Sequence, residues 1–157
     1  FNSQDSFNAF CRGVLSAWDS TSQSGSVATQ EFAPRLRQIE QKEEGTIPTG
    51  WGGVVVTSYV HPEVEKYLVV KKGGYLAFEK HDEKVETLTV QEGAGILLYR
   101  LKGESQLAVA VLRPGYEITL HPGEEHCIIG TENLLVFERS TDPKGMEKDL
   151  IFIFTPA

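Results

Sequence analysis

Cysteine is scarce in this chain of 157 residues, which contains only Cys11 and Cys127. The two are expected in different parts of the fold, so they do not indicate a disulfide framework. They also supply no thiolate set for a structural zinc site. Long apolar runs are missing as well, since none approaches the length of about 18 residues that indicates a transmembrane helix. The first residues show no basic-then-apolar pattern of a signal peptide. We therefore expect a soluble, cytoplasmic protein.

Basic residues are outnumbered. The chain has 15 Lys and Arg against 22 Asp and Glu, a formal charge of −7, and a pI near 5.1. This balance disfavours nucleic acid and anionic membranes as partners, although a local pocket can still bind a small anion. The length and a hydrophobic content of 40% fit one domain that buries a sizeable core. We expect a small-molecule partner, no nucleic acid and no membrane.

Residues 1–45 differ in pattern from the rest of the chain. Apolar side chains recur there at helical spacing, at Phe7, Phe10, Val14, Leu15 and Trp18. Asp5 or Ser6 is placed to cap this helix. A loop rich in Ser, Thr and Gly is expected over Asp19–Ser26, before a weaker stripe of Phe32, Leu36 and Ile39. We expect residues 1–45 to form a helical arm that covers an end or edge of the following domain or contributes to a dimer contact.

From residue 46 to residue 157, short strand-like segments alternate with turn residues. The pattern predicts strands near Val54–Tyr59, Lys66–Lys71, Tyr75–Lys80, Glu86–Gln91, Gly95–Leu101, Gln106–Leu112, Tyr116–Leu120, His126–Ile129, Asn133–Arg139 and Asp149–Phe154. So many short strands without intervening helices favour an antiparallel sandwich or barrel. The last strand is apolar on both faces, so we expect it to be buried between the barrel and a helix or partner subunit.

Potential metal ligands gather in the segment from Glu79 to Glu86. Glu79 and His81 stand two residues apart, so on a strand they share a face. Asp82–Val85 is polar enough to form a turn, after which a hairpin would bring Glu86 beside His81. His126 follows a second turn, and Cys127 next to it is expected to point the other way. Imidazole and carboxylate ligands suit Zn, Fe, Mn, Ni or Co. Solvated side chains near turns remain the alternative.

The same two segments resemble the paired motifs of the cupin superfamily. In the first segment, five residues separate Gly73 from Glu79, which stands in the place of the first motif histidine. His81 matches the second histidine. Four residues then lead to Glu86, and six more lead to Gly93. In the second segment Gly115, Gly123 and His126 fall at matching offsets, whereas His121 replaces the motif proline and Gly130 the final asparagine. The resemblance covers residues 46–157.

This resemblance implies an all-β double-stranded β-helix (jelly-roll) barrel, here with an N-terminal helical extension. It places Glu79, His81, Glu86 and His126 at metal-ligand positions, whereas Glu83 belongs to the turn. The resemblance also implies a divalent metal ion such as Zn, Mn, Fe or Ni. Glu79 departs from the motif: as a ligand it favours Mn or Fe, and if it stands off the metal the other three form a two-His-one-carboxylate triad. A site that has lost tight metal binding is a third alternative.

Within the superfamily, the segment Glu138-Arg139-Ser140-Thr141 and the form of the first motif are similar to mannose-6-phosphate isomerase-like cupins and cupin sugar isomerases. That likeness implies an aldose–ketose isomerase acting on a sugar or sugar phosphate through a metal-stabilised enediolate. Lys84 and Glu138 are the candidate general bases. Arg139 or Lys71 is a candidate phosphate ligand, and Trp51, Tyr99 and Phe78 are candidates for stacking on a sugar ring.

Two other functions remain open: a non-enzymatic cupin that binds a carbohydrate or metabolite, and an Fe(II)-dependent dioxygenase that uses His81, Glu86 and His126. The apolar last strand and the helical arm lead us to expect a homodimer.

Overall fold

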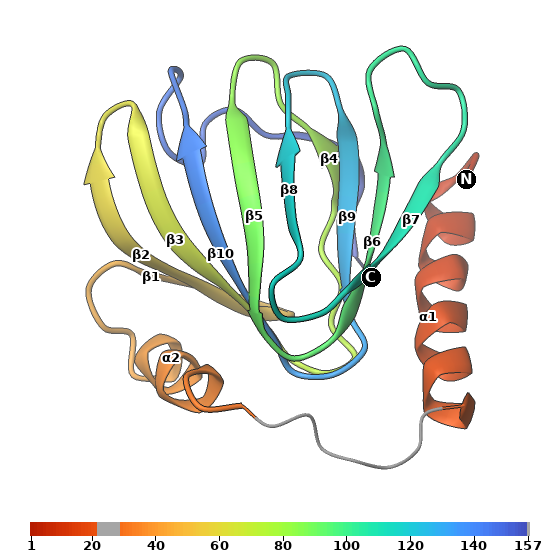
Figure 1. Ribbon diagram of the computed structural model, residues 1–157, viewed down its shortest axis with the longest axis horizontal. Coiled ribbons are helices and arrows are strands. Elements are labelled where there is room, and N and C mark those ends of the chain that lie inside the picture. Colours follow the sequence, from red (N-terminus) through yellow and green to blue (C-terminus); the bar gives the residue numbers. More distant parts are fainter. Residues whose placement is uncertain (22–28, 157) are drawn as a thin grey trace.

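Two antiparallel sheets face each other in the computed structural model, which describes residues 1–21 and 29–156 (Figure 1). The first sheet has the order β1-β2-β3-β10-β5-β8 and the second β11-β4-β9-β6-β7. The strands are β1 (Thr46–Thr49), β2 (Gly52–Val60), β3 (Glu63–Val70), β4 (Phe78–Lys80), β5 (Val85–Glu92), β6 (Gly95–Arg100), β7 (Ala108–Leu112), β8 (Glu117–Leu120), β9 (Glu125–Gly130), β10 (Leu134–Thr141) and β11 (Ile151–Phe154). This arrangement confirms the all-β, double-stranded β-helix architecture.

The core between the sheets follows from strand alternation. Along β10, Val136 and Glu138 point inward, and the register pairs them with Leu68 and Lys66 of β3. On β5 the buried residues alternate with partly exposed threonines. Most inward positions are aliphatic and form one cluster that fills the space between the sheets. At one end, however, the inward positions carry charge, and this is where the candidate site lies.

The first helix, α1 (Gln4–Thr21), stands against the outer face of the second sheet (Figure 1). Its Phe7 and Cys11 are buried there against Phe78 and Cys127. Ser3 caps the helix, because its Oγ accepts the backbone N–H of Ser6 at 3.1 Å. The cap thus lies two to three residues before the expected Asp5 or Ser6, although Ser6 takes part in it, since its Oγ accepts the backbone N–H of Ser3 at 3.1 Å.

The side chains of Cys11 and Cys127 pack in one buried cluster, and both cysteines are free. As expected, they belong to different elements, Cys11 to α1 and Cys127 to β9, and they form no disulfide. As predicted, Cys127 packs on the face of its strand opposite His126, since strand alternation sends adjacent side chains to opposite faces.

The second helix, α2 (Phe32–Glu40), packs on the outer face of the first sheet through Phe32 and Ile39. Its N-terminus is capped from a distance: the carboxylate of Glu92, at the end of β5, accepts the backbone N–H groups of Gln30, Glu31 and Phe32 at 2.8–3.1 Å. A carboxylate at this position also complements the helix dipole. In the described part of the chain, no helix is both long and apolar enough to cross a bilayer.

All ten predicted strands are present, with shifted ends. The strand expected from Tyr75 is regular only in β4, although Tyr75 forms an isolated bridge to Ile129. The short β1 was missed. In the last strand, Ile153 and Phe154 pack towards α1, as expected, whereas Phe152 is 54% exposed in the single chain. Burial of this strand by a partner subunit stays a prediction. The loop expected over Asp19–Ser26 is helical to Thr21, and its remainder lies outside the described residues. The division between an arm of residues 1–45 and a barrel of residues 46–157 stays a prediction.

Candidate metal centre

Three strands carry the potential ligands to one end of the cavity between the sheets. Glu79 lies in β4 and pairs with His126 of β9, while His81 directly follows β4. Glu86 is the second residue of β5, which belongs to the other sheet. The prediction that β4 and β5 form a hairpin was therefore wrong. The turn after His81 instead carries the chain from one sheet to the other, and it still brings Glu86 beside His81.

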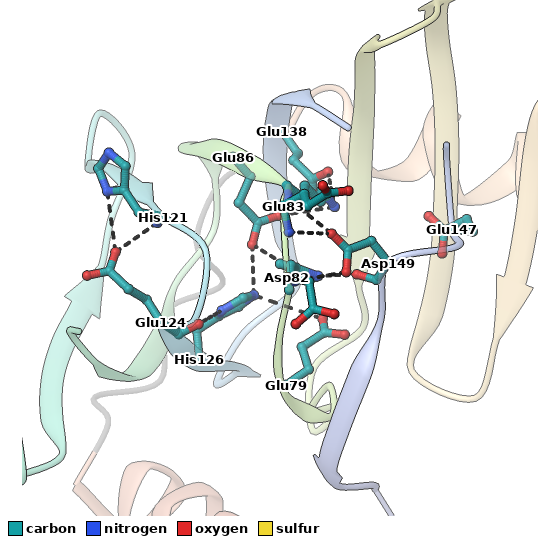
Figure 2. Close-up of polar contacts among 12 residues, drawn as sticks. Glu79, Asp82, Glu83, Glu86, His121, Glu124, His126, Glu138, Glu147 and Asp149 are labelled. Carbon is teal, nitrogen blue, oxygen red and sulfur yellow. Dashed lines mark hydrogen bonds and ion pairs between the residues drawn. The ribbon is translucent and has the colours of Figure 1, made fainter. Parts of the chain in front are cut away.

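The donor atoms converge around one carboxylate oxygen (Figure 2). Oε1 of Glu86 lies 2.8 Å from Nε2 of His126 and 3.3 Å from Nε2 of His81. A carboxylate oxygen of Glu79 lies 4.0 Å from Nε2 of His126, and the ligand atoms of Glu79, His81 and His126 all lie within 4.8 Å of one another. All three of His81, Glu86 and His126 are buried. The four predicted ligands are thus brought together.

Both imidazoles are oriented through their other ring nitrogen. Nδ1 of His81 lies 2.6 Å from the carbonyl oxygen of Asp149, and Nδ1 of His126 lies 3.3 Å from the carbonyl oxygen of Glu124. A carbonyl only accepts, so each Nδ1 carries the hydrogen and donates it. In the neutral rings, Nε2 then presents its lone pair to the centre. This is the usual arrangement of histidines that bind metal ions in proteins.

Asp149 also shapes the turn that carries these residues. Its carboxylate accepts the backbone N–H groups of Asp82, Glu83 and Lys84 at 2.8–3.0 Å. Burial alone would raise the pKa of the Asp149 carboxyl, but these three hydrogen bonds outweigh burial and lower it. Glu83 is exposed in the turn, as predicted. Asp149 therefore fixes both the turn and the ring of His81.

The charges of the centre compensate one another in the metal-free protein. Burial disfavours the charged form of His126, but the adjacent Glu86 carboxylate prevails and raises the pKa of His126 to about 9. Burial would raise the pKa of Glu86, whereas His126 and Lys84 hold it well below the usual range. Burial raises the pKa of Glu79. A metal ion must therefore displace a proton from His126 in order to bind.

A buried chain of ion pairs leads away from the centre. Nζ of Lys84 lies 3.3 Å from Glu86 and 3.0 Å from Glu138. Nζ of Lys66 lies 3.4 Å from the same oxygen of Glu138 and 2.6 Å from Glu147. Burial would lower the pKa of Lys84, but the carboxylates of Glu138 and Glu86 outweigh it and raise it. Both lysines are thus held in the ammonium form.

A cavity of about 240 Å³ adjoins the centre. Its polar end includes Glu79, Glu86, His126 and the ion-pair chain, and the rest of its wall is mostly apolar. Of the three predicted stacking residues, Trp51 lines the cavity, whereas Tyr99 packs in the inner core and Phe78 against α1.

The predicted phosphate ligands do not reach this cavity. Lys71 is exposed beyond the end of β3, and the side chain of Arg139 is 68% exposed and lies 3.7 Å from Glu65. Arg139 points outward because it alternates with the inward-facing Glu138. The sequence reasoning missed Lys66 and Asp149. Lys66 had a usable signal, since it is a charged residue at an alternate position of β3 whose same-face neighbours, Val64 and Leu68, are apolar.

Solved structures with a double-stranded β-helix share this architecture. The chain is similar to the capsular polysaccharide assembling protein CapF from Staphylococcus aureus, with a TM-score of 0.60 and 15% identity over 70% of this chain and 32% of that chain. It is also similar to a cupin-2 domain from Rhodospirillum rubrum, with a TM-score of 0.54 and 16% identity over 68% of each chain. This chain has the cupin fold.

A third cupin-fold neighbour is an oxalate decarboxylase from Lactobacillus farciminis, with a TM-score of 0.58 and 16% identity over 69% of this chain and 33% of that chain. The chain thus spans about a third of the length of CapF and of this decarboxylase. No protein-family model and no curated protein sequence matches it. At these identities the likeness is one of fold alone, and the narrower resemblance to sugar isomerases stays a prediction.

Proposed function

We propose that this cupin-fold protein holds a divalent metal ion through His81, Glu86 and His126 and isomerises a small neutral sugar. One observation supports the metal centre most strongly. The Nε2 atoms of His81 and His126 both lie beside the same oxygen of Glu86, while their Nδ1 atoms donate to backbone carbonyls. Separations of 2.8 and 3.3 Å suit neighbouring donors around a single ion whose bonds are about 2.0–2.2 Å long. The Glu79 oxygen is more distant, which leaves it free to accept a proton.

When bound, the ion supplies a Lewis acid that stabilises the negative charge of an enediolate. Glu79 takes the proton from C2 of an open-chain aldose and returns it to C1, while the hydroxyl proton on O2 passes to O1. Lys84, held as an ammonium between two carboxylates, is a poor proton acceptor. It serves instead as a hydrogen-bond donor to a ligand oxygen, and Glu138 keeps it charged.

The charge of the cavity favours a neutral substrate over a phosphorylated one. Four carboxylates line it, those of Glu79, Glu86, Glu138 and Glu147, against the ammonium groups of Lys66 and Lys84. With neutral imidazoles, a divalent cation brings the sum of these charges to zero. Among the described residues that line the cavity, both lysines are already paired with carboxylates, so a phosphate would add negative charge without a free cationic partner. The volume of about 240 Å³ lies below the range of roughly 300–1,000 Å³ of drug-sized pockets, which suits a monosaccharide.

The deciding experiment combines metal analysis with an isomerase assay on protein purified without a nickel column. We expect about one Mn or Fe per chain and aldose-to-ketose conversion of unphosphorylated pentoses or hexoses. His126→Gln should lose both metal and activity. Glu79→Gln should retain metal and lose kcat by about 10²–10⁴-fold, as expected for removal of a general base. Full activity in Glu79→Gln would exclude Glu79 as the base, and protein that cannot be loaded with any metal would exclude the proposed function.

A non-enzymatic binding protein is the second candidate, and it is favoured by a specific observation. His126 and Glu86 already form a close, buried ion pair 2.8 Å long, so the centre is electrically compensated without metal. On this alternative, sugars bind to metal-free protein and are not converted. Oxygen uptake by Fe(II)-loaded protein in the presence of organic substrates would instead indicate a dioxygenase.

A further inference from the structure

One of the carboxylates that line the cavity differs from the others in its origin. Glu79, Glu86 and Glu138 belong to strands, whereas Glu147 belongs to the loop over residues 142–150 that joins β10 to β11. The side chain of Glu147 is 36% exposed, but those of Glu86 and Glu138 are 3% and 4% exposed. Glu147 lies apart from the potential metal ligands, at the end of the buried ion-pair chain (Figure 2). It is therefore the outermost member of that chain.

We propose that Glu147 determines the charge of the ligands that the cavity accepts. Its carboxylate occupies the ammonium group of Lys66, so that a neutral sugar is admitted and a sugar acid is excluded. The inference rests on the proposed function for the choice of sugars as ligands, and it adds the residue that selects among them. Without the Glu147 carboxylate, the same cavity is expected to bind polyhydroxylated chains that carry one carboxylate.

The contacts of Lys66 are the first observation. Nζ of Lys66 lies 2.6 Å from Oε1 of Glu147 and 3.4 Å from Oε2 of Glu138. The same Glu138 oxygen lies 3.0 Å from Nζ of Lys84, so Glu138 is shared between two ammonium groups and Glu147 is the nearer partner of Lys66. The Lys66 side chain is only 5% exposed, and a buried ammonium group that loses a partner is costly. The place that the Glu147 carboxylate fills therefore favours an anion.

The position of the Glu147 carboxylate is the second observation. Its Oε1 contacts Nζ of Lys66, while the Glu147 side chain lines the cavity and is partly exposed. Removing this carboxylate therefore opens the space beside the buried ammonium group to molecules in the cavity. A ligand carboxylate has the charge and the hydrogen-bonding oxygens that fit this space. In the parent protein, a sugar acid has to compete with Glu147, whose attachment to the chain gives it a high effective concentration there.

The backbone of the loop is the third observation, because Glu147 has φ +63°, in the left-handed region that residues other than glycine rarely adopt. Among the described residues, Lys42 is the other non-glycine residue of this kind, and it follows the end of α2, where the conformation is common. Glu147 ends no helix. The loop is held on either side of it, since Tyr59 Oη accepts the N–H of Met146 at 3.4 Å and the Asp149 carboxylate bonds to the turn after His81. Conformations of this kind persist where surrounding contacts hold them, and they concentrate at functional sites.

The balance of charge in the cavity agrees with this selection. With a divalent ion and neutral imidazoles, the carboxylates that line the cavity are balanced by the ion together with Lys66 and Lys84. A ligand carboxylate adds an uncompensated negative charge to the parent protein. Replacing Glu147 by Gln leaves one positive charge in excess, and a ligand with one carboxylate then restores the balance. Discrimination by charge of this kind needs an unfavourable contact with the wrong ligand, and Glu147 supplies it.

Calorimetric titrations with sorbitol and gluconate test the proposal, because these chains of equal length differ at one end only, where gluconate carries a carboxylate. We expect the parent protein to prefer sorbitol. Glu147→Gln removes the charge, and Glu147→Ala also clears the space beside Lys66. Both variants should bind gluconate about 10- to 100-fold more tightly than the parent does, while sorbitol affinity changes by less than about 3-fold. Adding Lys66→Met to Glu147→Ala should abolish the gain for gluconate.

Glu65→Gln is the matched control, because it changes the net charge by the same amount on the outer face of the same sheet. Glu65 is 43% exposed and lies 3.7 Å from Arg139. Unchanged gluconate affinity in both Glu147 variants, an equal gain for sorbitol, or the same gain in Glu65→Gln would overturn the proposal. Absorption of bound cobalt, which reports on the metal centre alone, separates this proposal from the proposed function. If no metal binds, the proposed function fails, and the gluconate titrations of metal-free protein still decide the role of Glu147.

Discussion

Asp149 is the residue whose replacement tests the construction of the centre most directly. Its side chain holds the turn over Asp82–Lys84, and its carbonyl orients His81. We expect Asp149→Ala to destabilise the protein strongly and to weaken metal binding, although Asp149 itself is not a proposed ligand.

The magnitude follows from the three hydrogen bonds that the carboxylate accepts. Hydrogen bonds to a charged group contribute about 1.5–3 kcal/mol each, but two of the three N–H groups are only partly buried and gain water when the carboxylate is removed. We therefore expect a loss of about 2–4 kcal/mol in the free energy of unfolding. For a chain of this size, this corresponds to a decrease in Tm of about 5–15 °C.

Thermal and urea unfolding of the metal-free protein measure this effect, and a metal-affinity titration measures its consequence at His81. We expect the affinity to fall by about 10- to 100-fold, as for other residues that orient a ligand. Asp82→Ala is the matched control: it removes a carboxylate of the same turn that is 58% exposed and pairs with Lys144 at 3.0 Å. That pair is exposed and screened by water, so its loss should change the stability little.

The pH dependence gives a further check, because the pKa of Asp149 is lowered in the folded protein. The carboxylate therefore stabilises the fold above its ordinary pKa of about 3.9, and this contribution is lost as the pH falls through the lowered value. The difference in unfolding free energy between the parent and Asp149→Asn should be constant near neutral pH and shrink below about pH 4. A stability equal to that of Asp82→Ala at neutral pH would refute the role assigned to the turn.

Three further predictions concern stability. Glu138→Gln should lower the free energy of unfolding by about 3–5 kcal/mol, because it leaves two buried ammonium groups without their shared carboxylate; a neutral effect in urea unfolding would contradict the ion-pair chain. Glu92→Gln should cost about 1–2 kcal/mol, since a charged cap of α2 is replaced by a neutral one; high salt should reduce the difference. Gly52→Ala should prevent folding or lower Tm markedly, because its Cβ would collide with a carbonyl, whereas Gly73→Ala, at φ +87° with nothing within 4 Å of its Cβ, should be milder. Similar Tm values for the two glycine variants would show that the collision is relieved.

Local spacing in the sequence was sufficient for much of the fold and for the four potential ligands. Two-residue alternation put Glu79 and His81 on one face and Cys127 away from His126, and the turn residues divided the strands correctly. The short β1 was missed because Thr46–Thr49 includes Pro48 and has no alternating apolar pattern. Proline is acceptable there, since β1 is an edge strand.

Contacts that depend on the register between strands far apart in the sequence could not be predicted from local sequence patterns. Lys66 and Glu138 are 72 residues apart in the sequence, and they meet only because β3 and β10 are paired in this register. Asp149 was expected within a strand, whereas it lies before β11 and bonds to a turn more than sixty residues earlier. No local pattern encodes either relation. The same limit explains why Lys71 and Arg139 were considered as phosphate ligands, although both lie outside the cavity.

The capping of α2 by Glu92 has a consequence for the order of folding. A nine-residue helix is too short to be stable alone in water, and the acid that completes its first turn is supplied by a strand some sixty residues later. The helix is therefore expected to form only after β5 has joined the sheet, and a peptide of residues 29–45 is expected to be mostly unfolded. Hydrogen exchange at the amides of Gln30, Glu31 and Phe32 would then report on the assembly of a sheet to which none of them belongs.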